Sequence, residues 1–237
     1  MDNFSSNPGR RQVQDISAVN SFLTKTYSIM ALAVLISALT AFLSTTVFKA
    51  AFVALFSNKA SAWIILFLPL ILSFAISFRA TRNPVASFVM LMIMAVAYGL
   101  TFAIICAAYT GATVATAFVS AAAVFITMAV YGTVTKRDLA NIGSYVTAAL
   151  IGFIVATIVN MFLRNPMITY IFAYIGVLIF VGLTAWNAQQ MKTIYAKYAD
   201  QTNSLGLATA GALQLYLDFV NLFMFFLQIF GMGGDRR

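Results

Sequence analysis

The chain has 237 residues, of which 62% are hydrophobic and only 8% are charged. Soluble proteins average about 25% charged residues, so this composition excludes a soluble globular domain and indicates an integral membrane protein. The net charge of +8 does not indicate a nucleic-acid partner, because the basic residues stand singly or in pairs at the ends of apolar runs, where they set membrane topology.

The apolar runs, taken in chain order, predict an all-α membrane protein with seven transmembrane helices, because a helix needs about 20 apolar residues to cross the hydrocarbon core. A transmembrane barrel is excluded, since its strands alternate apolar and polar residues. Six spans with a re-entrant last segment is the alternative. The predicted spans are Tyr27–Phe48, Ser61–Phe78, Val85–Tyr109, Ala112–Tyr131, Ser144–Leu163, Met167–Trp186 and Gly206–Phe230.

The boundaries between these runs predict three regions. A polar N-terminal tail covers residues 1–26, the seven-helix domain covers 27–230, and a short C-terminal tail covers 231–237. Within the first tail, apolar residues between Val13 and Leu23 recur at spacings of three and four. This pattern fits either an amphipathic helix on the membrane surface or a helical lead-in to the first span.

The third and fourth predicted spans are separated by "AAYTGAT" (Ala107–Thr113) and by no charged residue. Gly111 permits a tight reversal there, so we expect a hairpin. Pro84 and Pro166 stand near the starts of the third and sixth spans, where the missing N–H costs little.

The distribution of Lys and Arg predicts the orientation of the chain. With the N-terminus inside, the inside segments carry nine basic residues and the outside segments three, before the last two arginines are assigned. The positive-inside rule therefore favours a cytoplasmic N-terminus. The short tails favour a multi-pass protein of a bacterial inner membrane.

One acidic residue interrupts the last apolar run, "GALQLYLDFVNLFMFFLQIF". Asp218 lies on one helical face with Gly211, Gln214 and Asn221, at spacings of three and four. A carboxylate at the bilayer centre costs at least about 2.5 kcal/mol, so this face should point into the protein or a water-filled cavity. Asp218 is then either part of an ion pathway or gate, or a polar contact between helices worth about 0.6–2 kcal/mol.

Enzymatic groups are scarce. The chain has no His and no Glu, and only one Asp lies in a predicted span, so neither a Ser–His pair nor a paired-carboxylate protease site can form within the membrane. The single Cys106 excludes an internal disulfide. We expect no enzyme and no cofactor.

Three segments closely resemble the bacterial branch of the Bax inhibitor family, also called the transmembrane Bax inhibitor motif family. They are "YGTVTKRDLANIG" (Tyr131–Gly143), "IGVLIFVGLTAWNAQQMK" (Ile175–Lys192) and "ALQLYLDFVNLF" (Ala212–Phe223). The resemblance implies six helices around a central seventh and a pH-sensitive calcium leak. It also implies a pair of Asp residues that sense protons, one in the sixth helix and one in the seventh.

Asp218 matches the seventh-helix Asp of this resemblance, but the sixth-helix position holds Asn187, in "TAWNAQ" where the family has a segment like "TAYDTQ". The coupling between two carboxyls is then absent. Burial would favour the neutral form of Asp218, whereas a hydrogen bond donated by the Asn187 amide would favour the carboxylate. The direction of the net pKa shift therefore stays open. A weak calcium site would combine Asp218 with amide oxygens of Asn187, Asn221 or Gln214.

In some members an Arg of the second helix locks onto the acidic pair. Arg79 is the candidate here, and the alternative is that it only flanks the span as a positive-inside residue.

Two functions therefore stand. The first is a pH-sensitive calcium leak channel gated near Asp218, with proton sensing altered by Asn187. The second is a membrane-embedded regulator or adaptor of another membrane protein, such as a membrane protease. The expected partners are the lipid bilayer, calcium as the permeant ion and, for the adaptor, that second protein; nucleic acid is not among them.

Overall fold

The computed structural model describes residues 8–199 and 203–233, and this part of the chain consists of eight α-helices without a strand. All but α2 are long and apolar enough to cross a membrane, which confirms the predicted all-α fold with seven candidate spans. The helices are α1 (Pro8–Thr46), α2 (Lys49–Ser57), α3 (Lys59–Arg79), α4 (Pro84–Cys106), α5 (Gly111–Val134), α6 (Ala140–Leu163), α7 (Pro166–Tyr198) and α8 (Ser204–Gly233).

The local signals at the helix ends behave as predicted. The hairpin between α4 and α5 is present, and Thr110 caps α5 by accepting a hydrogen bond from the N–H of Thr113 at 3.2 Å. Pro84 and Pro166 lie in the first turns of α4 and α7, each directly after a capping Asn. At these positions the missing N–H of proline breaks no helical hydrogen bond.

Three helix boundaries differ from the predicted runs. α2 is an additional short helix, and α7 continues beyond Trp186 to Tyr198. α1 is continuous from Pro8 into the first span, so it includes much of the segment expected as a polar tail. Residues 1–7 of that tail and 234–237 of the expected C-terminal tail lie outside the described residues. Hydropathy indicates only which part of a helix is apolar enough to meet lipid. The helix itself can extend beyond that part, because its backbone hydrogen bonds form within the helix.

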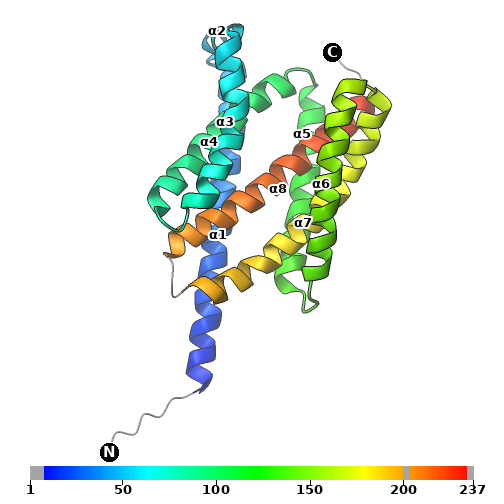
Figure 1. Cartoon of the computed structure of the whole chain (residues 1–237). Coiled ribbons are helices and arrows are strands. Elements are labelled where there is room, and N and C mark those ends of the chain that lie inside the picture. Colours follow the sequence, from blue (N-terminus) through cyan, green and yellow to red (C-terminus); the bar gives the residue numbers. More distant parts are fainter. Residues whose placement is uncertain (1–7, 200–202, 234–237) are drawn as a thin grey trace, which may run out of the picture.

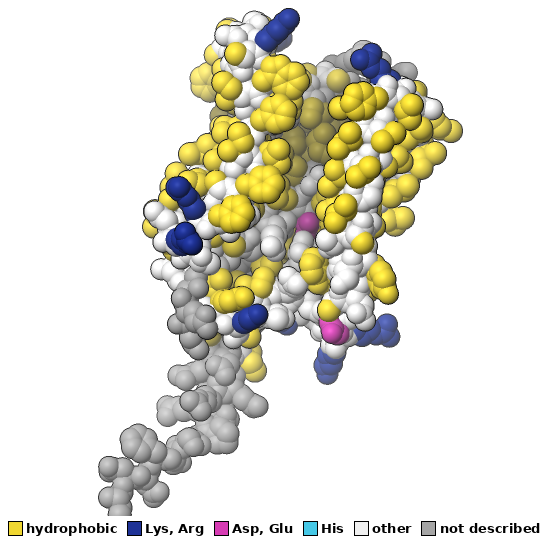
Figure 2. Space-filling model, in the orientation of Figure 1, with side chains coloured by type: hydrophobic (Ala, Val, Ile, Leu, Met, Phe, Trp, Pro, Cys, Tyr) yellow, Lys and Arg dark blue, Asp and Glu magenta, His cyan; other side chains and the backbone are white. Residues whose placement is uncertain are grey.

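Helix α8 lies between two groups of helices, one formed by α1, α3 and α4 and the other by α5, α6 and α7 (Figure 1). It packs mainly against α1, α4, α5 and α7 and also contacts α3, and half of its apolar window is buried, the largest share among the seven spans. α6 packs on α7 and reaches α8 through the rings of Phe153 and Phe225, whose centroids are 5.6 Å apart. Hydrophobic side chains cover the outer faces, and a hollow separates the two groups on the side shown in Figure 2.

The two ends of α8 lie at opposite ends of the bundle. Near its start, Gly206 lies so close to the carbonyl of Ala80, in the α3–α4 turn, that a Cβ would overlap it. Near its end, Gly231 lies in the same way against the ring of Tyr109, in the α4–α5 connection. These two connections bracket α4, so α8 runs the length of the bundle.

Small residues let other helices approach closely as well. A Cβ on Gly132 of α5 would overlap the carbonyl oxygen of Ala185 on α7. Close backbone approach at small residues is typical of helix packing in membranes, where lipid removes the hydrophobic driving force between helices. By contrast, Gly152 on the outer side of α6 has no neighbouring atom within 4 Å of where its Cβ would be.

Candidate functional site

Asp218 and Asn187 meet where α8 crosses α7. The Nδ2 of Asn187 donates a hydrogen bond of 2.7 Å to Oδ2 of Asp218. The Asp218 side chain is only 4% exposed, whereas Asn187 is half-buried. The structure thus joins the two residues that the sequence placed on neighbouring helices, and one amide supplies the hydrogen bond that a buried carboxyl requires.

The other predicted site residues do not join this pair. Gln214 is exposed one turn before Asp218, and Nδ2 of Asn221 donates to the carbonyl of Leu217 in its own helix, at 2.7 Å. Arg79 is an exposed residue at the end of α3. Within residues 8–199 and 203–233, Asn187 is the one side chain that hydrogen-bonds to the Asp218 carboxyl.

The site therefore offers few ligands for a metal ion. The described residues contain no cluster of three or more His, Cys, Asp or Glu side chains that could hold a metal. Calcium takes about six to eight oxygen ligands. One carboxylate with one amide partner supplies far fewer oxygen ligands than such a shell.

The segment Thr184–Gln189 of α7 also contacts α6 and the α5–α6 connection, and we call this segment the α7 junction. Trp186 packs directly over Gly143 of α6. Gln189 fastens the α5–α6 connection: its Oε1 accepts from the N–H of Leu139 at 2.8 Å and its Nε2 donates to the carbonyl of Arg137 at 2.7 Å. This role of Gln189 is not predicted from the sequence, although the residue lies within the family-like "TAWNAQ".

A second buried contact fixes α8 against α1 and α4. The hydroxyl of Tyr216, a fully buried residue, lies 2.7 Å from Oγ of Ser37, which in turn lies 2.8 Å from the carbonyl of Ala95. Tyr216 can donate to Ser37 while Ser37 donates to the carbonyl, so both hydroxyl protons are used. We call this contact the hydroxyl junction. This contact too is not predicted from the sequence.

A cavity of about 710 Å³ lies on the far side of α8 from Asp218. Its α8 wall is Tyr216, Phe219, Val220 and Phe223, which share one helical face. At about 100° per residue, Asp218 points nearly opposite to that face, although it lies at the same depth. The cavity and the carboxyl are therefore separated by the body of α8.

Comparisons with known proteins identify the family. The family model described as inhibitor of apoptosis-promoting Bax1 matches residues 19–235. An uncharacterized membrane protein of Streptococcus pyogenes serotype M3 is 38% identical over 214 residues, covering 90% of this chain and 93% of the relative. The inner membrane protein YbhL of Escherichia coli K12 is 34% identical over 222 residues, covering 92% of this chain and 94% of the relative.

The family match covers nearly all of the first candidate span and the other six in full, and it includes the positions of Asn187 and Asp218. Both relatives align over nine-tenths or more of this chain and of their own lengths. The chain is therefore a multi-pass membrane protein that belongs to the Bax inhibitor family.

Proposed function

We propose that the protein is a calcium leak channel of a bacterial inner membrane, with a cytoplasmic N-terminus, and that the Asn187–Asp218 contact is its gate. One observation carries the proposal: a carboxyl on the most buried span is held by a single hydrogen bond from the neighbouring helix. Acidic residues inside a membrane typically mark ion pathways. The inner-membrane relative supports the location.

The described structure corresponds to a closed state of this channel. Asp218 is almost fully buried, and the large cavity on the other face of α8 has no acidic residue among the side chains that line it. A cation must reach Asp218 to pass, so conduction requires α7 and α8 to separate at their contact. The open state is then a second conformation, and ligands or protons act by shifting its population.

The amide at position 187 makes this gate less dependent on protons than a pair of carboxyls would be. Two adjacent carboxyls can hydrogen-bond only while they share a proton, whereas the Asn187 amide can donate to Oδ2 whether or not the other oxygen carries one. Hydrogen bonds to an ionised acceptor are roughly twice as strong, so protonation weakens the contact without removing it.

A second candidate function, an adaptor for another membrane protein such as a membrane protease, is favoured by the α5–α6 connection. Gln189 holds its backbone in place, while the side chains of Lys136, Arg137 and Asp138 are exposed. A fixed loop with exposed charges suits recognition by a partner. The family is not a known enzyme family, in line with either function.

Calcium release from liposomes that contain only this protein tests the proposal. We expect wild-type protein to release calcium and Asp218→Asn to abolish the release. Asp138→Asn is the matched control, because an Asn there can still accept the hydrogen bond from the N–H of Ala140. If liposomes with the wild-type protein release no calcium, the channel proposal is wrong and the adaptor is favoured. If Asp218→Asn releases calcium as fully as the wild type, Asp218 is not the gate.

A further inference from the structure

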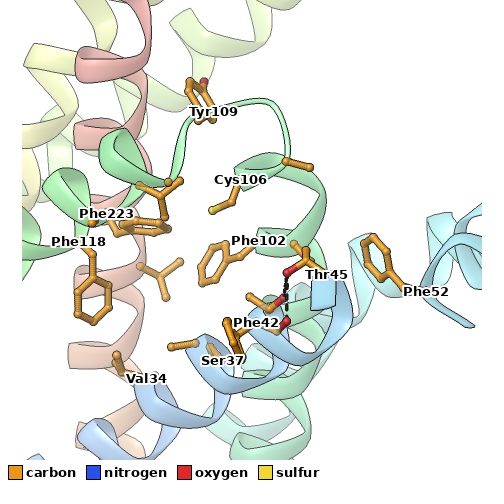
Figure 3. A pocket seen from close by; sticks show the side chains of 18 of the residues that line it. Val34, Ser37, Phe42, Thr45, Phe52, Phe102, Cys106, Tyr109, Phe118 and Phe223 are labelled. Carbon is orange, nitrogen blue, oxygen red and sulfur yellow. Dashed lines mark hydrogen bonds between the residues drawn. The ribbon is translucent and has the colours of Figure 1, made fainter. Parts of the chain in front are cut away.

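The cavity on the face of α8 opposite Asp218 is lined mostly by apolar side chains and by a single charged one. Aromatic and aliphatic side chains form most of its wall (Figure 3). Lys49 is the one charged residue among those that line it. Its volume of about 710 Å³ lies within the range of roughly 300–1,000 Å³ that is usual for small-molecule sites. A cation is disfavoured here, because the only charge is positive.

The cavity has the length and shape of a slot. The α1 wall runs from Val34 to Thr45, along one helical face, which corresponds to about 16 Å at 1.5 Å per residue. Tyr216 and Ser37 of the hydroxyl junction are among the residues that line the cavity, and Lys49 of α2 lies beyond Thr45, after the end of α1. The single charge is therefore at one end of a long apolar space.

The slot lies between α1 and α5 where these two helices are apart; they contact each other further along, where the hydroxyls of Tyr27 and Thr133 are 3.1 Å apart. α1 packs against α4 and α8, α5 packs against α7 and α8, and the cavity occupies the space between α1 and α5. Ala38 on the α1 wall and Ala115 on the α5 wall both have exposed side chains. A chain-like molecule could thus enter sideways from the surrounding bilayer.

An apolar space of this size does not stay empty in a membrane. Atoms that line a void lose their dispersion contacts, and water gains too few hydrogen bonds in an apolar cavity to fill it. The bilayer supplies alkyl chains, and Lys49 selects among them by charge. We propose that the cavity is a binding site for a free fatty acid, with its alkyl chain between α1 and α5 and its carboxylate at Lys49.

Photo-crosslinking tests this site directly. Full-length protein in phosphatidylcholine nanodiscs is labelled with a palmitic acid analogue that carries a mid-chain diazirine, and labelled peptides are located by mass spectrometry. The palmityl alcohol analogue serves as the uncharged probe, and a diazirine phosphatidylglycerol tests whether a bilayer phospholipid is the occupant instead. We expect fatty-acid labels on the α1, α5 and α8 walls.

Four variants make the result specific. Ala38→Phe and Ala115→Phe place a ring in the open space from opposite walls, so each should reduce labelling of the cavity severalfold. Lys49→Gln should lower fatty-acid labelling by up to about fivefold, as for an exposed ion pair, and leave alcohol labelling unchanged. Lys59→Gln, at the start of α3 and outside the cavity lining, is the matched control.

The fatty-acid site is overturned if labels spread evenly over lipid-facing helices, if both filling variants label like wild type, or if Lys49→Gln and Lys59→Gln behave alike. It is also overturned if the phospholipid probe labels the cavity and the fatty acid does not. If Ala38→Phe and Ala115→Phe melt at the same temperature as the wild type, both variants are folded. Lys49→Gln tests the site without altering the interior. None of these outcomes depends on calcium release.

Discussion

Replacing Asn187 by Asp would put a second carboxyl in direct contact with Asp218. The amide nitrogen that the new oxygen replaces lies 2.7 Å from Oδ2 of Asp218. Two unit charges at that separation repel by about 6 kcal/mol at an effective dielectric constant of 20. A hydrogen bond to a charged group contributes only about 1.5–3 kcal/mol, so repulsion decides the behaviour of the variant.

The two carboxyls of Asn187→Asp should therefore lose their protons in two separate steps that belong to the pair. While one proton is shared, it bridges α7 and α8. Once it is lost, the carboxylates repel and favour the separated helices. The variant should be less stable and leak more calcium on the alkaline side of that step, whereas wild type, with an amide donor, should lack the step.

The assay is calcium release from liposomes, together with thermal unfolding in detergent, from about pH 5 to 8, a range that covers coupled carboxyls. Asn20→Asp is the matched control, because it adds the same charge on an exposed face of α1. If the wild-type and Asn187→Asp profiles coincide in both measurements, residues 187 and 218 are not neighbours in one site. The unfolding measurement keeps this test informative even in a protein that does not conduct calcium.

Two further predictions concern topology and packing. In a chain without its native cysteine, a cysteine at Thr135 should react with impermeant reagents only from the cytoplasmic side and one at Ser57 only from outside, and the reverse pattern would invert the proposed orientation. Gly132→Ala should cost about 1–3 kcal/mol, or roughly 2–4 °C of melting temperature per kcal/mol, because its methyl group meets a backbone carbonyl of α7. Gly152→Ala, the control in open space, should instead gain about 0.5–1 kcal/mol, and equal effects of the two changes would contradict the packing.

The sequence predicts the spans well because hydropathy reports directly which residues meet lipid. It fails for α2, whose nine residues are too short to cross a membrane and of which none is buried. It also fails for the end of α7, where polar helix formers such as those in "NAQQMK" continue the helix after the apolar signal has stopped. Both misses concern helix outside the predicted spans.

The candidate site is predictable only where the family resemblance supplies a pair of positions. It points to Asn187 and Asp218, which the structure joins. The partners of Gln189 and Tyr216 come from segments far away in the chain, and a single polar residue in an apolar run carries no information about which distant helix it will meet. The same holds for the cavity, which depends on the separation of α1 from the first half of α5.

The position of Asn187 on the helix made just before α8 has a consequence for biogenesis. All the helices that pack around α8 precede it in the chain, so they leave the ribosome first. When α8 reaches the translocon, its carboxyl meets a donor that is already in the membrane, and the cost of at least about 2.5 kcal/mol for inserting an acid is offset at once. Insertion of α8 is thus coupled to the prior assembly of the other helices, and a chain with α7 out of place would stall with its last segment outside the lipid.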